Sequence, residues 1–268
     1  MKGKSHRPGL YKCRSCRKPF TVTVGTVFER SKAPLHKWVL ATHLLAASKK
    51  GMSAHQLHRM LGVTYKTAWF MAHSIREAMM DDSPEPMGGF RKYVEADETL
   101  YGQRGYVFDN DEGWKPKAGP GDMYRILALV ERGGQARSFH VKDGTAKTIR
   151  KKLVENIDRE STLMTDEAGA YKKVGQEFRR HRRVNHSKKE WSRGLTASTN
   201  TIEGYFSLFK RGMNGVYQHC GEKHLQRYLN EFDFRYTHRK VDDSTRAEIA
   251  LEQIGGKRLT YRRPRQWL

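Results

Sequence analysis

The sequence predicts a mixed α/β protein in which a small helical domain precedes a larger domain built around a sheet. Three observations support this class. The segment before about residue 80 shows helical apolar periodicity, an acidic stretch rich in proline and glycine follows at "DDSPEPMGG", and strand-like segments then alternate with helical ones. Because such alternation is typical of a sheet with helices packed on its faces, we expect a mixed sheet.

The charge of the chain indicates a polyanionic partner. Its 268 residues include 51 Lys and Arg against 29 Asp and Glu, a formal net charge of +22. Residues 1–80 hold 15 Lys or Arg against only two acids, residues 172–193 form a second basic segment, and "RRPRQW" lies near the end. Each run alone could be a solvated face, but together they favour binding to DNA.

The cysteine count and hydropathy indicate the compartment. Three cysteines are too few for a disulfide framework, and no apolar run is long enough to span a bilayer. Met1 leads into "KGKSHRPG", without the apolar core of a signal peptide. We therefore expect a soluble, cytoplasmic and nucleoid-associated protein without a membrane partner.

Residues 1–30 are expected to form part of a zinc ribbon. Cys13 and Cys16 have the two-residue gap that lets two thiolates reach one tetrahedral zinc, and the following "FTVTVGTVF" alternates like a strand. No second cysteine pair precedes Cys13, only His6 is nearby, and Cys220 is far downstream. We expect a partial ribbon that binds zinc poorly or not at all; a site completed in another way is the alternative.

Residues 31–82 are expected to form a helix-turn-helix domain. A helical period covers 35–47, a capping pair starts a second helix at Ser53, and Gly62 ends it. The third helix then begins with three residues that a helix-turn-helix would place in the major groove of DNA: Tyr65, Lys66 and Thr67. A plain helical hairpin without a DNA role is the alternative.

A linker at 83–90 is expected to lead into the sheet domain, residues 91–240, and then into a basic tail, residues 241–268. The polar segment 102–122 is expected to be a mobile insertion. Expected strands lie at 92–100, 124–132, 136–143, 161–166 and 179–186, and expected helices lie at 146–157, 167–176, 200–212 and 222–239.

Three carboxylates form a candidate active centre. Asp97 lies within the first strand, Asp166 ends the fourth, and Glu203 lies on the helix 200–212. If a three-stranded meander is followed by a parallel return, the two Asp residues lie on neighbouring strands and the helix brings in Glu203. Three convergent carboxylates need a cation, so the pattern indicates hard divalent metals and phosphodiester cleavage or strand transfer.

Each carboxylate also has a structural interpretation. Asp97 could be an edge-strand charge, Asp166 a helix N-cap, and Glu203 the partner of Asn200 in a capping box. Lys210 follows Glu203 by seven residues, nearly two helical turns, and so shares its face and can contact a phosphate. The opposite face of this helix is expected to pack through Ile202, Tyr205, Phe206 and Phe209.

Five segments carry a resemblance to a known family. They are "GLYKCRSCRKPFTVTVGTVFE", "VEADETLYG", "LMTDEAGAYKKVG", "VNHSKKEW" and "NTIEGYFSLFKRGMNGVYQH". In this order they resemble insertion-sequence transposases of the DDE type, in the ISXO2-like group that joins a zinc ribbon and a helix-turn-helix to a ribonuclease H-like domain. The spacing agrees, since 68 residues separate Asp97 from Asp166 and 36 separate Asp166 from Glu203.

The resemblance implies a ribonuclease H-like mixed sheet with flanking helices and two Mg²⁺ ions, which Mn²⁺ can replace. Asp97, Asp166 and Glu203 would be the catalytic metal ligands, with Lys210 as the basic residue that follows. Asn200 is a rival for the third catalytic position, and His186 could lie near the metals. Family members carry an earlier cysteine pair that has no counterpart before Cys13, which puts Zn²⁺ binding in question.

The implied reaction starts with cleavage by water at transposon ends, after which the freed 3′ hydroxyl attacks target DNA. The implied partners are the terminal repeats and target DNA, handled by a homodimer or a larger assembly. Besides the third helix, we expect DNA contacts from Arg179, Arg180, Arg182, Arg183, Lys188 and Lys189. The alternatives are a catalytically inactive, sequence-specific DNA-binding remnant and a structure-selective nuclease.

Overall fold

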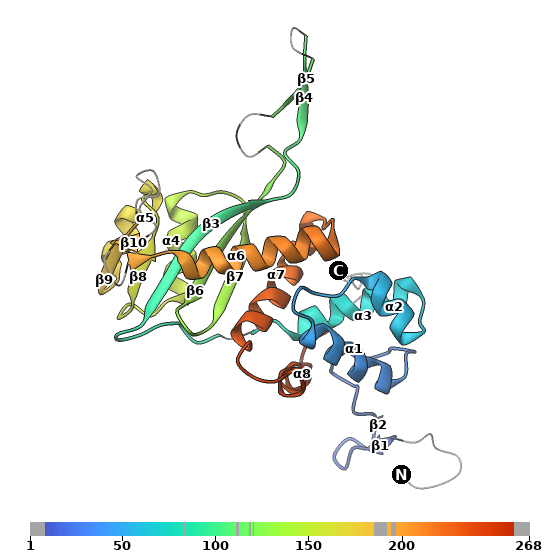
Figure 1. Cartoon of the computed structure of the whole chain (residues 1–268). Helices are drawn as coiled ribbons and strands as arrows, with labels where there is room; N and C mark the ends of the chain where they lie inside the picture. Colours follow the sequence, from blue (N-terminus) through green and yellow to red (C-terminus); the bar gives the residue numbers. More distant parts are fainter. Residues whose placement is uncertain are drawn as a thin grey trace, which may run out of the picture. The chain divides into compact units, whose positions relative to one another are not determined.

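The computed structural model describes residues 9–82, 84–110, 113–117, 119, 121–184, 192–193 and 197–259 (Figure 1). The chain divides into two compact units. The first comprises residues 1–48, 52–80 and 242–268, and the second comprises residues 49–51 and 81–241. Within the described part of the chain, no helix is both long and apolar enough to cross a bilayer.

The first unit contains the three helices that the sequence predicts: α1 (Leu35–Ala47), α2 (Ala54–Leu61) and α3 (Tyr65–Ala78). The side chain of Ser53 accepts a hydrogen bond from the Gln56 amide and caps α2, as expected. Gly62 ends α2 with a left-handed φ of 57°. Thr64 then caps α3, so the local sequence sets both ends of the short turn.

Residues 22–25 and 27–30 form turns, and Thr26 makes an isolated antiparallel bridge with Gly255, so the expected strand there is wrong. The two-stranded sheet before them is short, pairing β1 (Tyr11–Lys12) with β2 (Pro19–Phe20). Beyond it the threonines bond locally: Thr26 Oγ1 donates to the Thr23 carbonyl at 2.8 Å, and the Thr26 amide donates to the same oxygen at 3.2 Å. These local bonds compete with strand pairing, which apolar alternation alone does not reveal.

The segment expected to be a basic tail contributes a helix to the first unit. Helix α8 (Asp243–Glu252) begins after Asp242, whose side chain accepts hydrogen bonds from the amides of Ser244 and Thr245. It packs on α1 and buries Ala247 and Ala250. The small apolar face of α8 gives only a weak periodic signal, which explains why the sequence did not predict it.

The second unit is built on a five-stranded mixed sheet with the order β7-β6-β3-β8-β9. Strand β6 runs antiparallel to both β3 and β7, whereas β8 runs parallel to β3 and to β9. This confirms the predicted ribonuclease H-like mixed sheet. The strands are β3 (Tyr93–Tyr101), β6 (Tyr124–Glu131), β7 (Ala136–Val141), β8 (Thr162–Thr165) and β9 (Arg180–Arg183).

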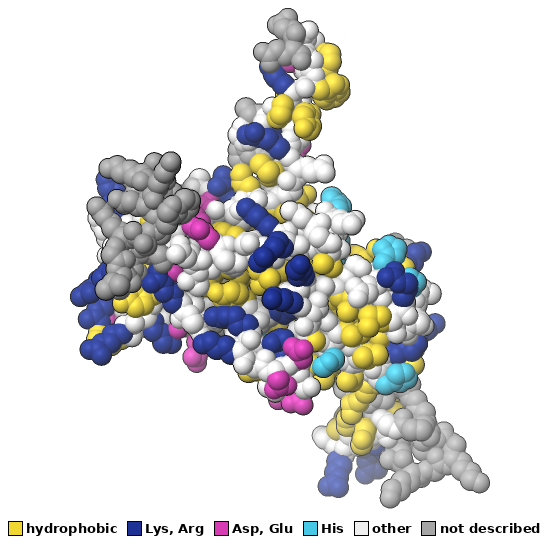
Figure 2. All heavy atoms as spheres, in the orientation of Figure 1, with side chains coloured by type: hydrophobic (Ala, Val, Ile, Leu, Met, Phe, Trp, Pro, Cys, Tyr) yellow, Lys and Arg dark blue, Asp and Glu magenta, His cyan; other side chains and the backbone are white. Residues whose placement is uncertain are grey.

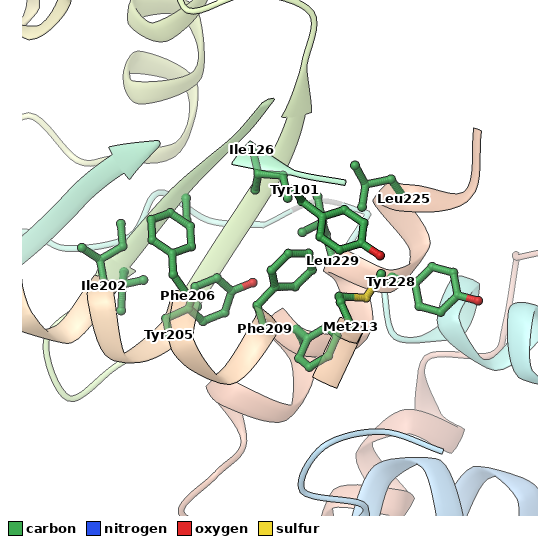
Figure 3. Packing of buried hydrophobic residues seen from close by; sticks show 14 of the residues in the cluster. Tyr101, Ile126, Ile202, Tyr205, Phe206, Phe209, Met213, Leu225, Tyr228 and Leu229 are labelled. Carbon is green, nitrogen blue, oxygen red and sulfur yellow. The ribbon is translucent and has the colours of Figure 1, made fainter. Parts of the chain in front are cut away.

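Helices cover both faces of the sheet. Helices α6 (Asn200–Gly212) and α7 (Glu222–Thr237) pack on one face, where Ile202, Phe206 and Phe209 point from α6 into the core (Figure 3). Helices α4 (Ala146–Asn156) and α5 (Gly169–Val174), followed by the 3₁₀ turn η1 (Gly175–Glu177), cover the other. The expected packing face of α6 is therefore confirmed.

The insertion between β3 and β6 is not an irregular loop. It contains an antiparallel hairpin, β4 (Tyr106–Asp109) and β5 (Gly113–Pro116), that extends away from the sheet (Figure 1). Phe108 pairs with Trp114 across the hairpin, and their rings meet edge to face at 5.5 Å. The polar composition concealed two strands of four residues each, held by one aromatic cross-strand pair.

Candidate active site

Asp97 lies within β3, and Asp166 directly follows the last residue of β8, the strand that runs parallel to β3. The register of β3 and β8 pairs Glu95 with Met164, and each Asp lies two residues farther along its strand direction. Side chains alternate between the faces of a strand, so Asp97 shares the face of Glu95. Asp166 lies just beyond β8. The neighbouring strands that the sequence predicts for these two acids are therefore present.

Tyr171 of α5 shows that acids gather at this end of the sheet. Burial raises the pKa of Tyr171 well above its ordinary value, and the negative charges of Glu98, Asp97 and Asp166 raise it further. The Tyr171 hydroxyl donates to Glu98 Oε1 at 3.5 Å, and Glu98 Oε2 accepts from Arg125 at 2.8 Å. Glu98 forms an ion pair with Arg125, and Asp97 and Asp166 add negative charge near the ring.

Asp97 and Asp166 also make local hydrogen bonds. Asp97 Oδ1 accepts from the amide of Glu98 at 2.7 Å. Asp166 Oδ1 accepts from the amide of Ala168, the N-cap residue of α5, at 3.0 Å. The alternative that Asp166 is the helix N-cap is wrong, because the N-cap of α5 is Ala168 and the Asp166 side chain bonds the amide of that residue.

Glu95 attaches α6 to β3. This side chain is completely buried, and its Oε2 accepts a hydrogen bond from the Ile202 amide in the first turn of α6 at 2.9 Å. Its Oε1 accepts from Arg132 Nε at 2.6 Å. A carboxylate at a helix N-terminus satisfies a free amide and interacts favourably with the helix dipole. Glu95 therefore holds the helix that carries Glu203 against the strand that carries Asp97.

Glu203 lies in the first turn of α6, but not in the capping box expected as its alternative. The N-cap is Thr199, one residue before Asn200, and it makes no side-chain cap bond. Thr199 Oγ1 instead donates to Glu203 Oε1 at 3.1 Å, which orients the carboxylate. Asn200 is the exposed first residue of α6.

Asp97, Glu203 and Lys210 line one open hollow of about 780 Å³. Lys210 therefore lies on the same face of α6 as Glu203, as its spacing predicts. Asp166 is not among the lining residues. Within the part of the chain that the structure describes, no three His, Cys, Asp or Glu side chains lie close enough to hold one metal ion.

Sequence reasoning missed several residues of this site. Ser207, Arg211 and Asn214 line the hollow together with Lys210. A charge pattern gives a weak signal for Arg211, since it follows Lys210 directly. The sequence gives no signal for Glu95, because the amide that it bonds is 107 residues away along the chain.

The two N-terminal cysteines lie close together. Hydrogen bonds from the backbone and side chain of Cys16, and from the backbone of Ser15, lower the pKa of the Cys13 thiol. The Cys13 amide also donates to the Lys18 carbonyl at 2.9 Å, which closes the turn between β1 and β2. Cys13 and Cys16 therefore lie on one tight turn between the two short strands.

The predicted DNA-reading residues begin helix α3. Tyr65 and Lys66 are exposed, and the Tyr65 ring stacks on His55 with 4.4 Å between centroids. Thr67 is engaged by the N-cap of the helix, because its amide donates to Thr64 Oγ1 at 3.2 Å. Tyr65 and Lys66 are therefore the more accessible of the three.

The second basic segment contains the edge strand β9. Arg180 and Arg183 are exposed, and Arg182 is half-buried. The Arg179 guanidinium lies over the Phe90 ring, 4.1 Å from its centroid. Lys and Arg side chains gather along this edge and over the exposed side of α6 (Figure 2). The other predicted residues of this segment, His186, Lys188 and Lys189, lie outside the described residues.

Residues 88–237 match the ISXO2-like transposase domain, which covers more than half of the chain. The protein belongs to this transposase family. An uncharacterised protein in the transposable element ISH50 of Halobacterium salinarum is 28% identical over 236 residues, which are 84% of this chain and 77% of the relative. The family assignment agrees with the resemblance that the sequence motifs carry.

Solved structures of DNA-processing complexes are also similar to this transposase-family chain. The Mos1 strand transfer complex matches with a TM-score of 0.32 and 12% identity, over 84% of this chain and 77% of that chain. The simian T-cell lymphotropic virus intasome in complex with the PP2A regulatory subunit B56 gamma matches with a TM-score of 0.30 and 15% identity, over 66% and 63% of the chains. Both TM-scores are low, so neither structure adds to what the sheet itself shows.

Proposed function

We propose that this chain is an active DNA transposase that cleaves at the ends of its transposable element and joins the freed 3′ hydroxyl to target DNA. The observation that supports this best is the placement of Asp97 within β3 and of Asp166 at the end of the adjacent parallel strand β8. Glu203 and Lys210 share one hollow with Asp97, which supplies a third carboxylate and a cation for phosphate.

The donor set fits a pair of Mg²⁺ or Mn²⁺ ions. Asp97, Asp166 and Glu203 offer only oxygen, which hard divalent cations prefer. The three carboxylates are not gathered into one ligand group, and mutual repulsion is a physical reason for them to stay apart without a cation. When bound, two such ions stabilise the attacking and departing oxygens of an in-line phosphoryl displacement.

The residues around the acids have separate tasks in this proposal. Glu95 holds α6 so that Glu203 faces the strand of Asp97. Lys210 and Arg211 bind the phosphates that flank the reacting one. Asn200 stays the rival for the third catalytic position, because it lies one turn before Glu203 at the exposed start of α6.

The DNA contacts are proposed to come from two further surfaces. Tyr65, Lys66 and Thr67 start the helix that would read base edges in the major groove. Basic residues on and around β9 would bind backbone phosphates: Arg179, Arg180, Arg182, Arg183, Lys188 and Lys189. Because two transposon ends must be handled together, we propose a homodimer or a larger assembly on DNA. Cys13 and Cys16 alone make a poor zinc site, since a structural zinc takes four ligands.

A cleavage and joining assay tests this function. A labelled duplex that carries the terminal repeat of the element is incubated with the protein and Mg²⁺ or Mn²⁺. We expect nicks at the repeat boundary and joined products with the unmodified chain and with Glu155→Gln, an exposed carboxylate of α4 on the other face. Glu203→Gln should bind the repeat without cutting it.

Three outcomes would contradict the proposal. Equal cleavage by Glu203→Gln would remove Glu203 from the active site. Binding of the repeat without any cleavage by the unmodified chain would identify a DNA-binding remnant. Cleavage of branched DNA without end joining would identify a structure-selective nuclease.

A further inference from the structure

A second hollow, of about 440 Å³, adjoins the hollow that Asp97, Glu203 and Lys210 line. Both belong to the same unit. Asn214 lines both hollows. The wall of the second contains two tyrosines, Tyr101 and Tyr124, and two further amide side chains, Gln103 and Gln218. Its volume falls within the roughly 300–1,000 Å³ of small-ligand sites, and polar groups that converge on such a site define its specificity.

The charge of the second hollow differs from that of the first. Lys210 and Arg211 line the first, but no Lys or Arg is among the described residues that line the second. The second contains instead the carboxylate of Asp122, which accepts from Lys117 at 2.7 Å. In a chain with a net charge of +22, a hollow without a cation is a poor site for phosphate.

The amide side chains in this hollow can both donate and accept. The side chains of Gln103, Asn214 and Gln218 form no hydrogen bond with any residue that the structure describes. Each offers an N–H₂ and a carbonyl oxygen. Such a set suits a neutral, planar group whose edge presents donors and acceptors together, which is the chemistry of a nucleobase.

The backbone at Gln218 is strained. Gln218 has φ 60° and ψ −48°, and the His219 amide donates to the Tyr217 carbonyl at 2.6 Å across it, which makes a γ-turn of the rare, strained kind. This turn follows a short π-helix, Met213–Tyr217, a structure that often occurs at functional sites. Glycine would adopt this conformation more readily, so the Gln side chain is present despite a conformational cost.

The tyrosines provide a surface for stacking and one hydroxyl. The Tyr124 ring is half-buried. It packs edge to face with the His140 ring, with 5.7 Å between the ring centroids. Burial raises the pKa of Tyr101 to about 12, so its hydroxyl stays protonated at neutral pH. Bases stack readily on aromatic side chains of this kind.

We propose that the second hollow takes one unstacked nucleobase of the DNA strand whose phosphate occupies the first hollow. Asn214 and Gln218 hydrogen-bond to the edge of the base, and Tyr124 lies against its face. Because Asn214 lines both hollows, a single nucleotide bridges them, with its phosphate beside Lys210. The inference rests on the proposed function, since it takes DNA as the substrate.

The experiment uses the full chain and a terminal-repeat duplex in which 2-aminopurine replaces one base at a time on each side of the cleavage boundary. Ca²⁺ replaces Mg²⁺ to prevent cleavage. We expect fluorescence to rise on binding at one position, as the base leaves the stack. Gln218→Gly and Asn214→Ala should lose most of this rise, while affinity measured by anisotropy falls no more than about tenfold, as expected for one contact. Gln176→Ala, an exposed amide after α5, should keep it.

The glycine variant separates recognition from folding. Gln218→Gly relieves the strained turn, so its melting temperature should equal or exceed that of the unmodified chain. Tight binding without a fluorescence rise at any position, or an equal rise in Gln218→Gly and Asn214→Ala, would overturn the inference and leave the proposed function intact. Failure of the unmodified chain to bind the duplex would overturn both.

Discussion

Asp97 lies within β3, and Asp166 directly follows the end of β8, the strand that pairs with β3 in parallel. The register ends at the pair Glu95 and Met164, and each Asp follows its paired residue by two positions. Neighbouring strands are about 4.8 Å apart, so backbone pairing brings the segments that carry the two carboxylates to the same end of the sheet. A divalent cation between the two carboxylates would be favoured, because it offsets their like charges.

Replacing either of these acids should remove cleavage without loss of stability. We expect Asp97→Asn and Asp166→Asn each to reduce the cleavage rate by at least about a hundredfold, as loss of a group that stabilises the transition state does. In a chelator, the free energy of unfolding should stay the same or rise, since one of two repelling charges is gone. Urea unfolding and cleavage kinetics measure the two effects. A strongly destabilised Asp97→Asn would show that Asp97 has mainly a structural role.

Glu95 should affect the metal requirement, although it is buried beneath the site. We expect Glu95→Gln to lower the free energy of unfolding by about 1–3 kcal/mol, because one charged hydrogen bond is lost. It should also raise the Mn²⁺ concentration needed for half-maximal cleavage, since the helix that carries Glu203 loosens. Amide exchange at Ile202 should become faster.

Glu131 provides the matched control for Glu95. It is also a buried carboxylate, bonded to Lys92 at 2.9 Å and to the Gly88 amide at 3.3 Å, but it makes no contact with α6 among the described bonds. Glu131→Gln should destabilise the chain without changing the Mn²⁺ requirement. If both variants raise the Mn²⁺ concentration for half-maximal cleavage equally, Glu95 has no special role in placing Glu203.

The two basic residues that line the hollow of Asp97 and Glu203 should control the salt dependence of DNA binding. Lys210→Ala and Arg211→Ala should each reduce the slope of log K against log salt by about 1, because each phosphate contact releases counterions. Lys151→Ala, on the exposed side of α4 at the other face of the sheet, should leave the slope unchanged. Anisotropy titrations across a salt series measure this. Equal slopes for all three variants would place the DNA elsewhere.

Asp233 of α7 should make stability depend on pH. Burial raises the pKa of Asp233 to about 6 from an ordinary value of 3.8, despite hydrogen bonds from Tyr205 and Ser138 that lower it. The folded chain then binds more protons here than the unfolded chain, so the contribution is complete below pH 3.8 and is lost as pH rises through about 6.

Asp233→Asn tests this assignment. We compare the free energy of unfolding of the unmodified chain with that of the variant. The difference between them should fall by roughly 1–3 kcal/mol from pH 4 to pH 7, as a pKa shift of this size implies. Urea unfolding at both values gives the difference. A difference that stays constant, or grows with pH, would show that Asp233 is ionised throughout.

The sequence predicted those parts of the site that depend on local pattern and spacing. Asp97 and Asp166 are in or next to strands with clear apolar runs, and Lys210 follows Glu203 at helical spacing, so their elements were accessible to sequence reasoning. The parallel pairing followed from the order of the elements.

The rest depends on contacts between distant segments or on weak local signals. Glu95 meets the Ile202 amide 107 residues later, and no pattern in the sequence encodes that bond. The hairpin β4–β5 and helix α8 are short and largely polar, so their apolar faces are too small for periodicity to reveal. The strained turn at Gln218 lacks the glycine that usually marks a positive φ.

Calorimetric titration of Mn²⁺ into the full chain tests the central claim most directly, that Asp97, Asp166 and Glu203 together hold divalent metal. Asp97→Asn, Asp166→Asn and Glu203→Gln should each lose most of the binding heat that the unmodified chain and Glu155→Gln retain. Binding heat that persists in all three site variants, or is absent from the unmodified chain both alone and with its terminal-repeat duplex, would contradict the account.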